Sequence, residues 1–228
     1  MKQVKVIVMT AFFTAVAVGM SAQNTFFPTK AGVVQMYEQK DAKGKTSGYT
    51  RMTIKEISGS GNNMSISYEV EGLDKNRKPQ FDPMPLTVTI KDGVVFLDMK
   101  QLFASMQQEM QGSVEFSGIP MELPSNMQPG TTLKDAESTM TIDLGIMKVT
   151  TVIKMTDGKC LAIEDVTTPA GTFKCYKITQ TVTTTVMNSS RPSRTVSWYA
   201  PGIGTVKTET YDNKDKLTGS TELVEVKN

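Results

Sequence analysis

The sequence predicts a mainly β protein: a single curved antiparallel sheet, a half-barrel or barrel-like in shape, with one amphipathic helix at about residues 99–111 packed on it. Three observations lead to this fold class. Apolar and polar residues alternate with period two along many short segments, Thr and Val are abundant in them, and polar turns join the segments in pairs.

The first 22 residues have the plan of a secretory signal peptide. Lys2 and Lys5 precede an uncharged apolar run over 6–18, and small residues close the segment. This run is shorter than the roughly 20 residues that a membrane-spanning helix needs, and no second such run follows. We therefore expect residues 1–22 to be cleaved, no transmembrane segment after cleavage, and a single β-rich domain over 23–228 in a periplasmic or otherwise extracytoplasmic location.

The charge of the chain depends on this leader. The full sequence has 25 Lys and Arg against 23 Asp and Glu, and the excess lies in the two leader lysines, which leaves 23 residues of each sign. Nucleic acids and anionic membranes are recognised by clusters of basic residues, and the balanced chain has no such cluster. We therefore expect no nucleic-acid partner.

The predicted strands follow one another as hairpins. Alternation is clearest in MSISYEVE (64–71), where Met64, Ile66, Tyr68 and Val70 share one face. Similar β-rich runs pair across short polar turns: 33–39 with 46–57, 86–90 with 94–98, 138–145 with 146–155, 161–167 with 172–182, and 205–212 with 217–226. About ten strands of this kind are enough for a sheet that curls on itself.

One segment, DMKQLFASMQQEMQG (98–112), has helical periodicity instead. Its apolar residues recur at helical spacing and are Met99, Leu102, Phe103, Met106 and Met110. Asp98 is suited to cap the first turn and Gly112 to end the helix. We expect its apolar face to lie on the sheet. The next segment, 113–133, is interrupted by Pro and Gly and is predicted to be a long loop.

The candidate ligand-binding residues come from this helix and from the only tryptophan. Met99, Phe103, Met106 and Met110 form an adaptable apolar stripe, because flexible thioether side chains fit varied apolar partners. The alternative is that the stripe is only the buried face of the helix. Trp198 precedes a Pro-Gly turn and is the fifth candidate, with packing at a strand end as its alternative role.

The two cysteines, Cys160 and Cys175, lie in one predicted hairpin that turns at 169–171. An unbroken register places Cys175 opposite Glu164 and Cys160 opposite Thr179, on the same face but roughly 13 Å apart at about 3.3 Å per residue. A disulfide needs Cα atoms within about 7 Å. The even cysteine count of an exported protein favours pairing, and a bulge would shift the register, but we predict no disulfide.

The chemistry open to the chain is limited because it contains no histidine. This excludes Ser-His-Asp and Cys-His hydrolases and the HExxH metalloproteases as they are ordinarily built. We find no metal-ligand set and no cofactor motif, and expect neither metal nor cofactor. A hydrolase that uses two carboxylates remains open, but most acidic residues lie in turns or alternate with apolar residues on strands. We therefore expect no enzyme.

Four stretches carry a family resemblance: EDVTTPAGTFKCYKI (164–178), WYAPGIGTVKTE (198–209), DGVVFLDMKQLF (92–103) and PGTTLKDA (129–136). They resemble the TapB-like family of exported proteins with a domain of unknown function. The resemblance implies a β-rich protein of the Gram-negative periplasm or cell envelope, and it brings no catalytic residues. By fold analogy, a curved sheet with a helix laid across it is also similar to the half-barrels of periplasmic lipoprotein carriers, which bind acyl chains on the concave face.

Three hypotheses about function follow. The first is a non-catalytic envelope protein that binds an apolar ligand, such as a lipid or a lipoprotein acyl chain, on the concave face of the sheet. The alternative is a structural or partner-binding protein of envelope assembly with a closed core. The third is a carboxylate-based hydrolase, which would need paired acids and a raised pKa.

Overall fold

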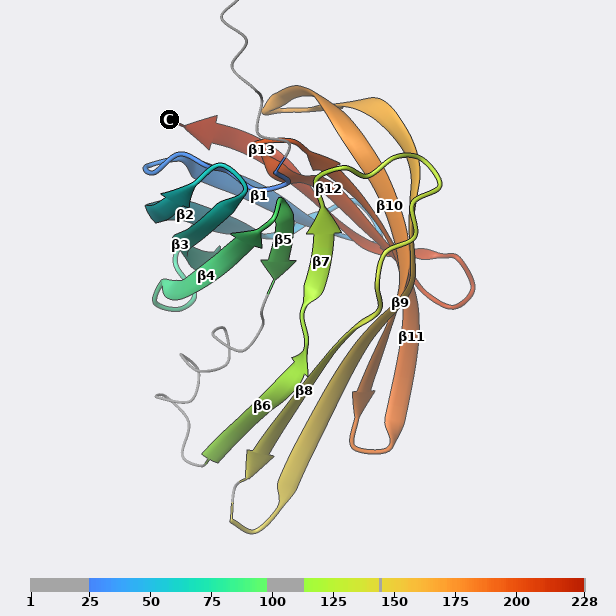
Figure 1. Cartoon of the computed structure of the whole chain (residues 1–228). Coiled ribbons are helices and arrows are strands. Elements are labelled where there is room, and N and C mark those ends of the chain that lie inside the picture. The colour runs from blue at the N-terminus through green and yellow to red at the C-terminus, as the bar shows by residue number, and fades with distance from the viewer. Residues whose placement is uncertain (1–24, 98–112, 144, 228) are drawn as a thin grey trace, which may run out of the picture.

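The computed structural model describes residues 25–97, 113–143 and 145–227, and these form a single antiparallel sheet of thirteen strands (Figure 1). The strands are β1 (Val34–Asp41), β2 (Thr46–Ser60), β3 (Asn63–Leu73), β4 (Met84–Lys91), β5 (Val94–Leu97), β6 (Ser113–Ile119), β7 (Met121–Pro124), β8 (Ala136–Asp143), β9 (Lys148–Thr168), β10 (Gly171–Val186), β11 (Ser189–Ala200), β12 (Gly204–Tyr211) and β13 (Leu217–Lys227). Thr, Val and Ile fill many of these strands, because branched side chains suit a pleated surface.

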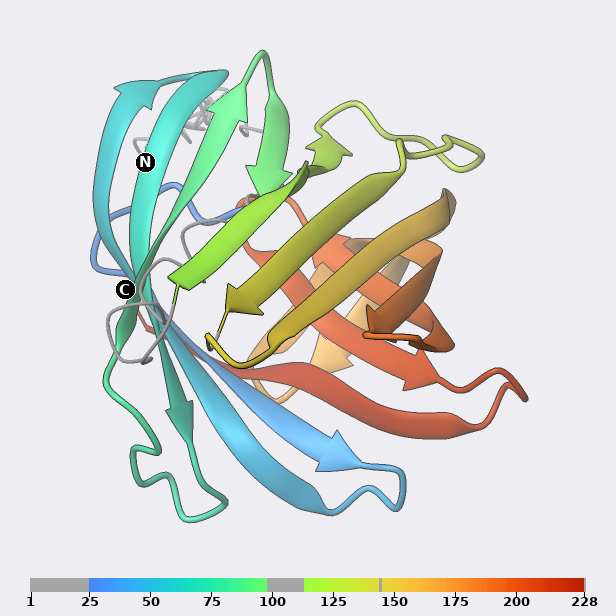
Figure 2. The same cartoon turned by 90° about the horizontal axis from the view of Figure 1, so that it is seen from below.

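The sheet consists of two meanders joined through the first and last strands. The strands β1 to β5 lie in chain order, and so do β8 to β13. The two runs meet where β13 pairs with β1, from Val34 opposite Lys227 to Asp41 opposite Gly219. Seen from below, the strands curl around a common axis (Figure 2). The sheet is therefore barrel-shaped, as the sequence predicts.

The barrel is nearly closed where β6 and β7 meet. These two strands lie at opposite ends of the strand order although only Pro120 separates them in the chain. β6 pairs with β8, whereas β7 pairs with β5. Proline has no N–H group to donate to a ladder, so it suits the point where the chain leaves one strand pairing and enters another. The loop before β8 adds further contacts, because Leu133 N donates to Gly158 O at 2.8 Å.

One end of the barrel is filled by a compact apolar core. Phe26 and Phe27 come just before β1, and their rings meet Tyr176 and Tyr68 edge to face at 5.0 and 5.2 Å. Buried side chains from strands all around the barrel surround them, among them Ile54, Ile66, Val88, Leu123, Ile178 and Leu223. Burial of each large apolar side chain is worth about 1.5–3 kcal/mol, so this core is the main source of stability at that end.

Most predicted hairpins are present, and one prediction is wrong. The segment 113–133, predicted to be a loop, contains β6 and β7. Pro120 ends one strand and begins the next without removing either, because alternating residues such as Val114, Phe116 and Met121, Leu123 supply two short strand patterns. The predicted helix at 99–111 lies outside the described residues. Among the residues that the structure describes, no helix is long and apolar enough to cross a membrane.

Two bulges in β9 change the predicted register around Cys160. Cys175 lies opposite Glu164, as predicted, but Cys160 lies opposite Ile178 instead of Thr179. The extra residue is Leu161, whose side chain is 46% exposed. A one-residue shift moves the following side chains to the other face of a sheet. The prediction that the two cysteines share a face is therefore wrong.

Candidate functional site

The candidate site is the concave face of the sheet beyond the filled core. β10 defines this face, because Ile178 is buried in the core and alternate residues of a strand point to the same side. Gln180, Val182 and Thr184 follow Ile178 on that side, away from the core. All three are half-buried. The concave face therefore continues past the point where the core ends.

Neighbouring strands extend this face into an apolar wall. Directly opposed residues of antiparallel strands point to the same side, so the register carries the assignment across the sheet. Met155 of β9 lies opposite Val182, and Ile153 follows two residues away. Met140 of β8 lies on the same face opposite Phe116 of β6. All five side chains are half-buried, and we call them the apolar wall.

A second apolar strip faces the same interior from β3 and β4. Val70 lies opposite Met84, and both are half-buried. Phe81, in the loop before β4, covers Gly72, where an added Cβ would lie 2.4 Å from the ring. A side chain at this position would displace the aromatic ring from the sheet. An exposed aromatic residue thus lies beside the concave face.

Hydroxyl groups line the part of the concave face between these apolar strips. Ser197 and Thr195 of β11 lie opposite Ile178 and Gln180. The Ser197 and Thr208 hydroxyl oxygens are 3.0 Å apart and share a hydrogen bond. The interior therefore presents apolar and neutral polar surface side by side, which suits a ligand with both characters.

Charged side chains of the strands gather on the convex face and pair there across strands. Arg51 Nη1 lies 2.6 Å from Glu71 Oε2, and Lys154 Nζ lies 3.0 Å from Glu137 Oε2. Such pairs in water contribute little to stability, but they keep the outer surface polar. Most charged side chains of the strands are thus kept away from the face of the apolar wall, with Arg191, opposite Thr184 near the end of β10, as an exception.

Carboxyl groups show no sign of acid chemistry. Among the described residues, every carboxyl group whose pKa is shifted has it lowered. A hydrogen bond from Thr46 is the main cause of the lowered pKa of Glu38. A hydrogen bond from Trp198 is the main cause of the lowered pKa of Glu164. A general acid needs the opposite shift. The described carboxyl groups therefore give the hydrolase hypothesis no support.

Trp198 lies on the convex face, away from the apolar wall. Its side chain is 6% exposed and packs with Cys175, Val196 and Val206 in an outer apolar cluster. Its Nε1 donates to Glu164 Oε1 at 2.7 Å, while Lys177 and a second lysine each lie 5.1 Å from the ring centroid. Trp198 is thus covered by charged side chains and is not brought together with the concave face.

The other predicted site residues, Met99, Phe103, Met106 and Met110, lie outside the described residues. They fall in the sequence between the end of β5 at Leu97 and the start of β6 at Ser113. Their part in ligand binding stays a prediction.

Both cysteines are free and buried. Burial raises the pKa of the Cys175 thiol to about 12, with further contributions from Asp165 and Glu164. Burial also raises the pKa of Cys160. A nucleophilic cysteine needs the opposite shift, since the thiolate is the reactive form. Neither thiol has the environment of a reactive group.

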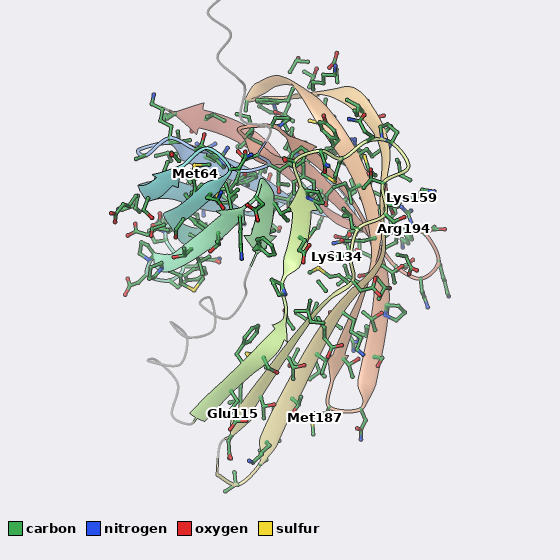
Figure 3. All side chains as sticks on the ribbon, in the orientation of Figure 1. Met64, Glu115, Lys134, Lys159, Met187 and Arg194 are labelled. Carbon is green, nitrogen blue, oxygen red and sulfur yellow. The ribbon has the colours of Figure 1, made fainter. Side chains whose placement is uncertain are left out.

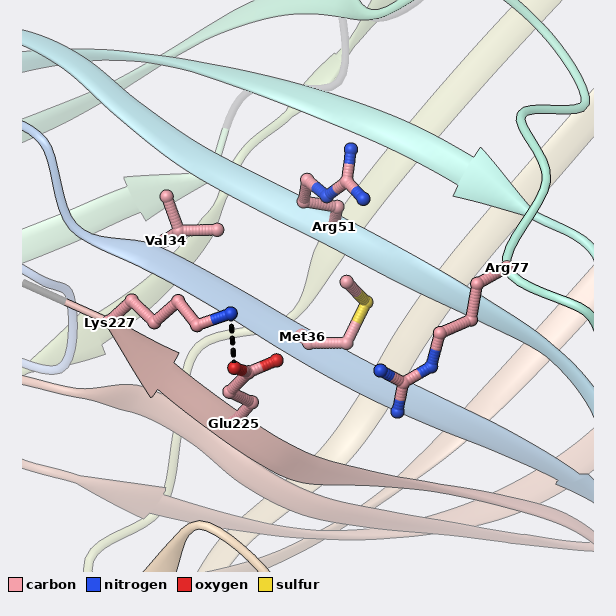
Figure 4. Close-up of a pocket in the computed structure, with 6 residues that line it drawn as sticks. All are labelled: Val34, Met36, Arg51, Arg77, Glu225 and Lys227. Carbon is pink, nitrogen blue, oxygen red and sulfur yellow. Dashed lines mark ion pairs between the residues drawn. The ribbon is translucent and has the colours of Figure 1, made fainter.

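A small pocket of about 140 Å³ lies on the convex face between β1, β2 and β13 (Figure 4). It is lined by Val34, Met36, Arg51, Arg77, Glu225 and Lys227. Lys227 pairs with Glu225 at 2.5 Å, and Arg51 pairs with Glu71. Arg77 lies over the ring of Tyr49, 4.7 Å from its centroid. The four charged side chains of the pocket therefore already have partners within the protein.

Sequence reasoning missed the apolar wall although part of its signal was present. Met140 and Met155 alternate with polar residues in the predicted hairpin 138–155. That alternation predicts one buried face for each strand but does not say whether a core or an open interior covers it. The distinction depends on how far the core around Phe26 and Phe27 extends, and these two residues lie far from 138–155 in the sequence.

These features define a class of protein: a nearly closed antiparallel β-barrel with one filled end and an amphipathic concave face. Residues 30–223 match the model of the DUF3108-like family. Because this match covers most of the sequence, the chain belongs to the DUF3108-like family.

Two solved structures share the fold of this chain. One is a Bacteroides fragilis protein with a YmcC-like fold, which is named as an expected exported protein. It matches with a TM-score of 0.72 and 22% sequence identity, and the match covers 90% of this chain and 99% of that protein. A Parabacteroides distasonis protein, named as an expected lipoprotein, matches with a TM-score of 0.73 and 23% identity over 89% and 98%. No curated protein matches the chain significantly.

Proposed function

We propose that this protein is a non-catalytic, extracytoplasmic protein that binds an acyl chain or a similar apolar ligand on the concave face of its sheet. The observation that carries the proposal is the apolar wall: Phe116, Met140, Ile153, Met155 and Val182 are half-buried and face the interior beyond the filled core. Half-buried apolar side chains gathered on a concave face are typical of sites for apolar ligands.

Location supports the same proposal. The leader-like residues 1–22 fit export, and so do the names of the two similar structures. A finer assignment to the TapB-like family is part of the proposal and rests on the four sequence stretches quoted above. The Met99 to Met110 stripe, if it packs on the concave face, would add apolar surface to the ligand site.

The test uses two neighbouring residues of β9 that point to opposite faces. Ile153 lies in the apolar wall, whereas Val152 lies opposite Thr139 and Thr185 on the convex face, and both are half-buried. Ile153→Asn places an amide in the proposed site. It should lower the affinity for fatty acid, measured by displacement of a fluorescent analogue, by about tenfold. Val152→Asn should leave the affinity unchanged.

Two results would argue against acyl-chain binding. One is a delipidated wild-type protein that binds no fatty acid and carries no copurified lipid in native mass spectrometry. The other is equal loss of affinity in both variants at equal thermal stability. Either would favour the alternative, a partner-binding envelope protein, which the filled core around Phe26 also fits.

A further inference from the structure

Two neighbouring hairpin turns end in exposed apolar side chains. In the β8–β9 turn, Ile146 is 94% exposed and Met147 is 44% exposed. In the β10–β11 turn, Val186 is 41% exposed and Met187 is 58% exposed. We call these four residues the apolar tips. Exposed apolar residues at adjacent turns are more than the scattered single ones of an ordinary surface.

The apolar tips belong to one surface because the two hairpins are joined. Met187 N donates to Thr150 O at 3.0 Å, and Val186 lies opposite Thr151. Both turns lie at the end of the molecule that is away from the filled core, where β6 and β8 to β11 extend past the other strands (Figures 1 and 3). The tips are therefore the part of the barrel that would first meet a flat surface.

Charges near the tips are balanced and lie behind the apolar side chains. Lys148 Nζ pairs with Asp143 Oδ2 at 3.0 Å, and Asp143 also accepts from Gly145 N within the turn. The hydrogen bond from Gly145 N, and after it the pairing with Lys148, lowers the pKa of Asp143, and the pairing raises the pKa of Lys148. Arg191 is exposed and lies opposite Thr184, set back along the strand from Met187. Long basic side chains at that depth can reach lipid phosphates while apolar residues insert further.

The tips also continue the concave face. Val186 follows Val182 and Thr184 on the inward side of β10. On β8, Met140 is followed by Ile142 on the same face, towards the turn that holds Ile146. Apolar side chains thus extend from the tips along the apolar wall to the core. An acyl chain that moved along this wall would stay in contact with apolar surface.

We propose that the apolar tips dock this protein on a lipid bilayer, from which the concave face takes up or to which it delivers an acyl chain. Two turns offer too few residues for a stable protein interface, which buries about 800 Å² on each partner. Insertion of apolar side chains into a bilayer interface requires no matching partner surface, because its strength follows the apolar area buried. The docking surface is inferred from the apolar tips alone, whereas its role in ligand transfer rests on the proposed function.

Vesicle cosedimentation tests the docking surface. The purified protein should sediment with phosphatidylcholine vesicles, and salt should have little effect because the tips are uncharged. Ile146→Ser combined with Met187→Ser should lower the bound fraction by about tenfold. Leu161→Ser is the matched control, because this residue is 46% exposed but lies at the bulge in β9 opposite the core end of β10, and it should bind as wild type.

Fluorescence provides an independent readout because Trp198 is the only tryptophan and lies in the outer cluster. Ile146→Trp should show a blue shift on addition of vesicles, while the wild-type protein should show none. Absence of vesicle binding by the wild-type protein, or equal binding by the double variant, would overturn the proposal. So would a dimer in solution that the double variant abolishes, since the tips would then bind a second copy.

Fatty-acid displacement separates the two proposals. The double variant should retain wild-type affinity for free fatty acid in solution, because its changes lie outside the apolar wall. Vesicle binding without fatty-acid binding would retain the docking surface and remove the ligand site. Fatty-acid binding without vesicle binding would retain the ligand site and remove the docking surface.

Discussion

At the scale of single residues, the structure separates side chains that the sequence places together. Cys160 and Cys175 are both buried, but Cys160 lies opposite the core residue Ile178, whereas Cys175 belongs to the outer cluster with Trp198. The inserted Leu161 causes this separation, because it reverses the faces of the residues between it and the second bulge near Asp157, which include Cys160. A single extra residue therefore decides the environment of a thiol.

The buried thiol of Cys175 predicts a loss of stability in alkaline solution. Its pKa is raised from 9.0 to about 12, so the folded state holds the proton after the unfolded state has lost it. The stabilisation is complete below pH 9.0 and declines as pH rises from there towards about 12. Cys175→Ala removes this contribution, so urea unfolding followed by Trp198 fluorescence should show a smaller loss of stability between about pH 8 and pH 10 than in wild type.

The comparison isolates the thiol, because Tyr37 and Tyr68 also have raised pKa values through burial and remain in both proteins. Cys175→Ala will lower stability at neutral pH by loss of packing, so only the pH dependence is informative. Identical pH dependence in the two proteins would show that the thiol does not ionise on unfolding in this range.

At the scale of elements, hairpins are predictable and bulges are not. The runs around the turns at 40–45 and 213–216 form β1–β2 and β12–β13, because period-two alternation and turn residues are both local signals. The bulges near Leu161 and Asp157 have no such signal, since they depend on what each face meets across the barrel. The faces of the β9 residues between these two bulges therefore cannot be predicted from periodicity alone.

Gly158 illustrates a local requirement that only the closed barrel explains. An added Cβ at this position would lie 2.8 Å from Leu133 Cβ, in the loop that closes the barrel next to β9. Gly158→Ala should therefore lower the free energy of unfolding by about 1–3 kcal/mol. Leu133 is 6% exposed, so its backbone and side chain have little room to move.

A double-mutant cycle checks the cause. In a Leu133→Gly background the crowding Cβ is absent, and Gly158→Ala should cost at least about 0.5 kcal/mol less than in wild type. Urea unfolding of the four proteins supplies the data. Fully additive effects would mean that the glycine is needed for its backbone conformation and not for this contact.

At the scale of the whole molecule, closure depends on strands that lie far apart in the sequence. β13 pairs with β12 on one side and with β1 on the other, and Leu223 from β13 is fully buried in the core. Loss of a buried leucine alone costs about 2–5 kcal/mol, a large part of the about 5–15 kcal/mol that holds a typical domain together. The last strand is therefore required for the fold.

A chain that ends at residue 216 should lack the β spectrum of the full protein in circular dichroism. A synthetic peptide of residues 217–227 added to it should restore that spectrum, because the open edges of β1 and β12 provide its hydrogen-bonding partners. A scrambled peptide of the same composition is the control. A truncated chain that folds without any peptide would contradict this account.

The pairing of the last strand with the first also sets when the protein can fold during its synthesis. β13 follows all the other strands in the chain, so no complete sheet exists until β13 has been synthesised. The order of strands thus delays closure of the barrel until the chain has been made as far as β13.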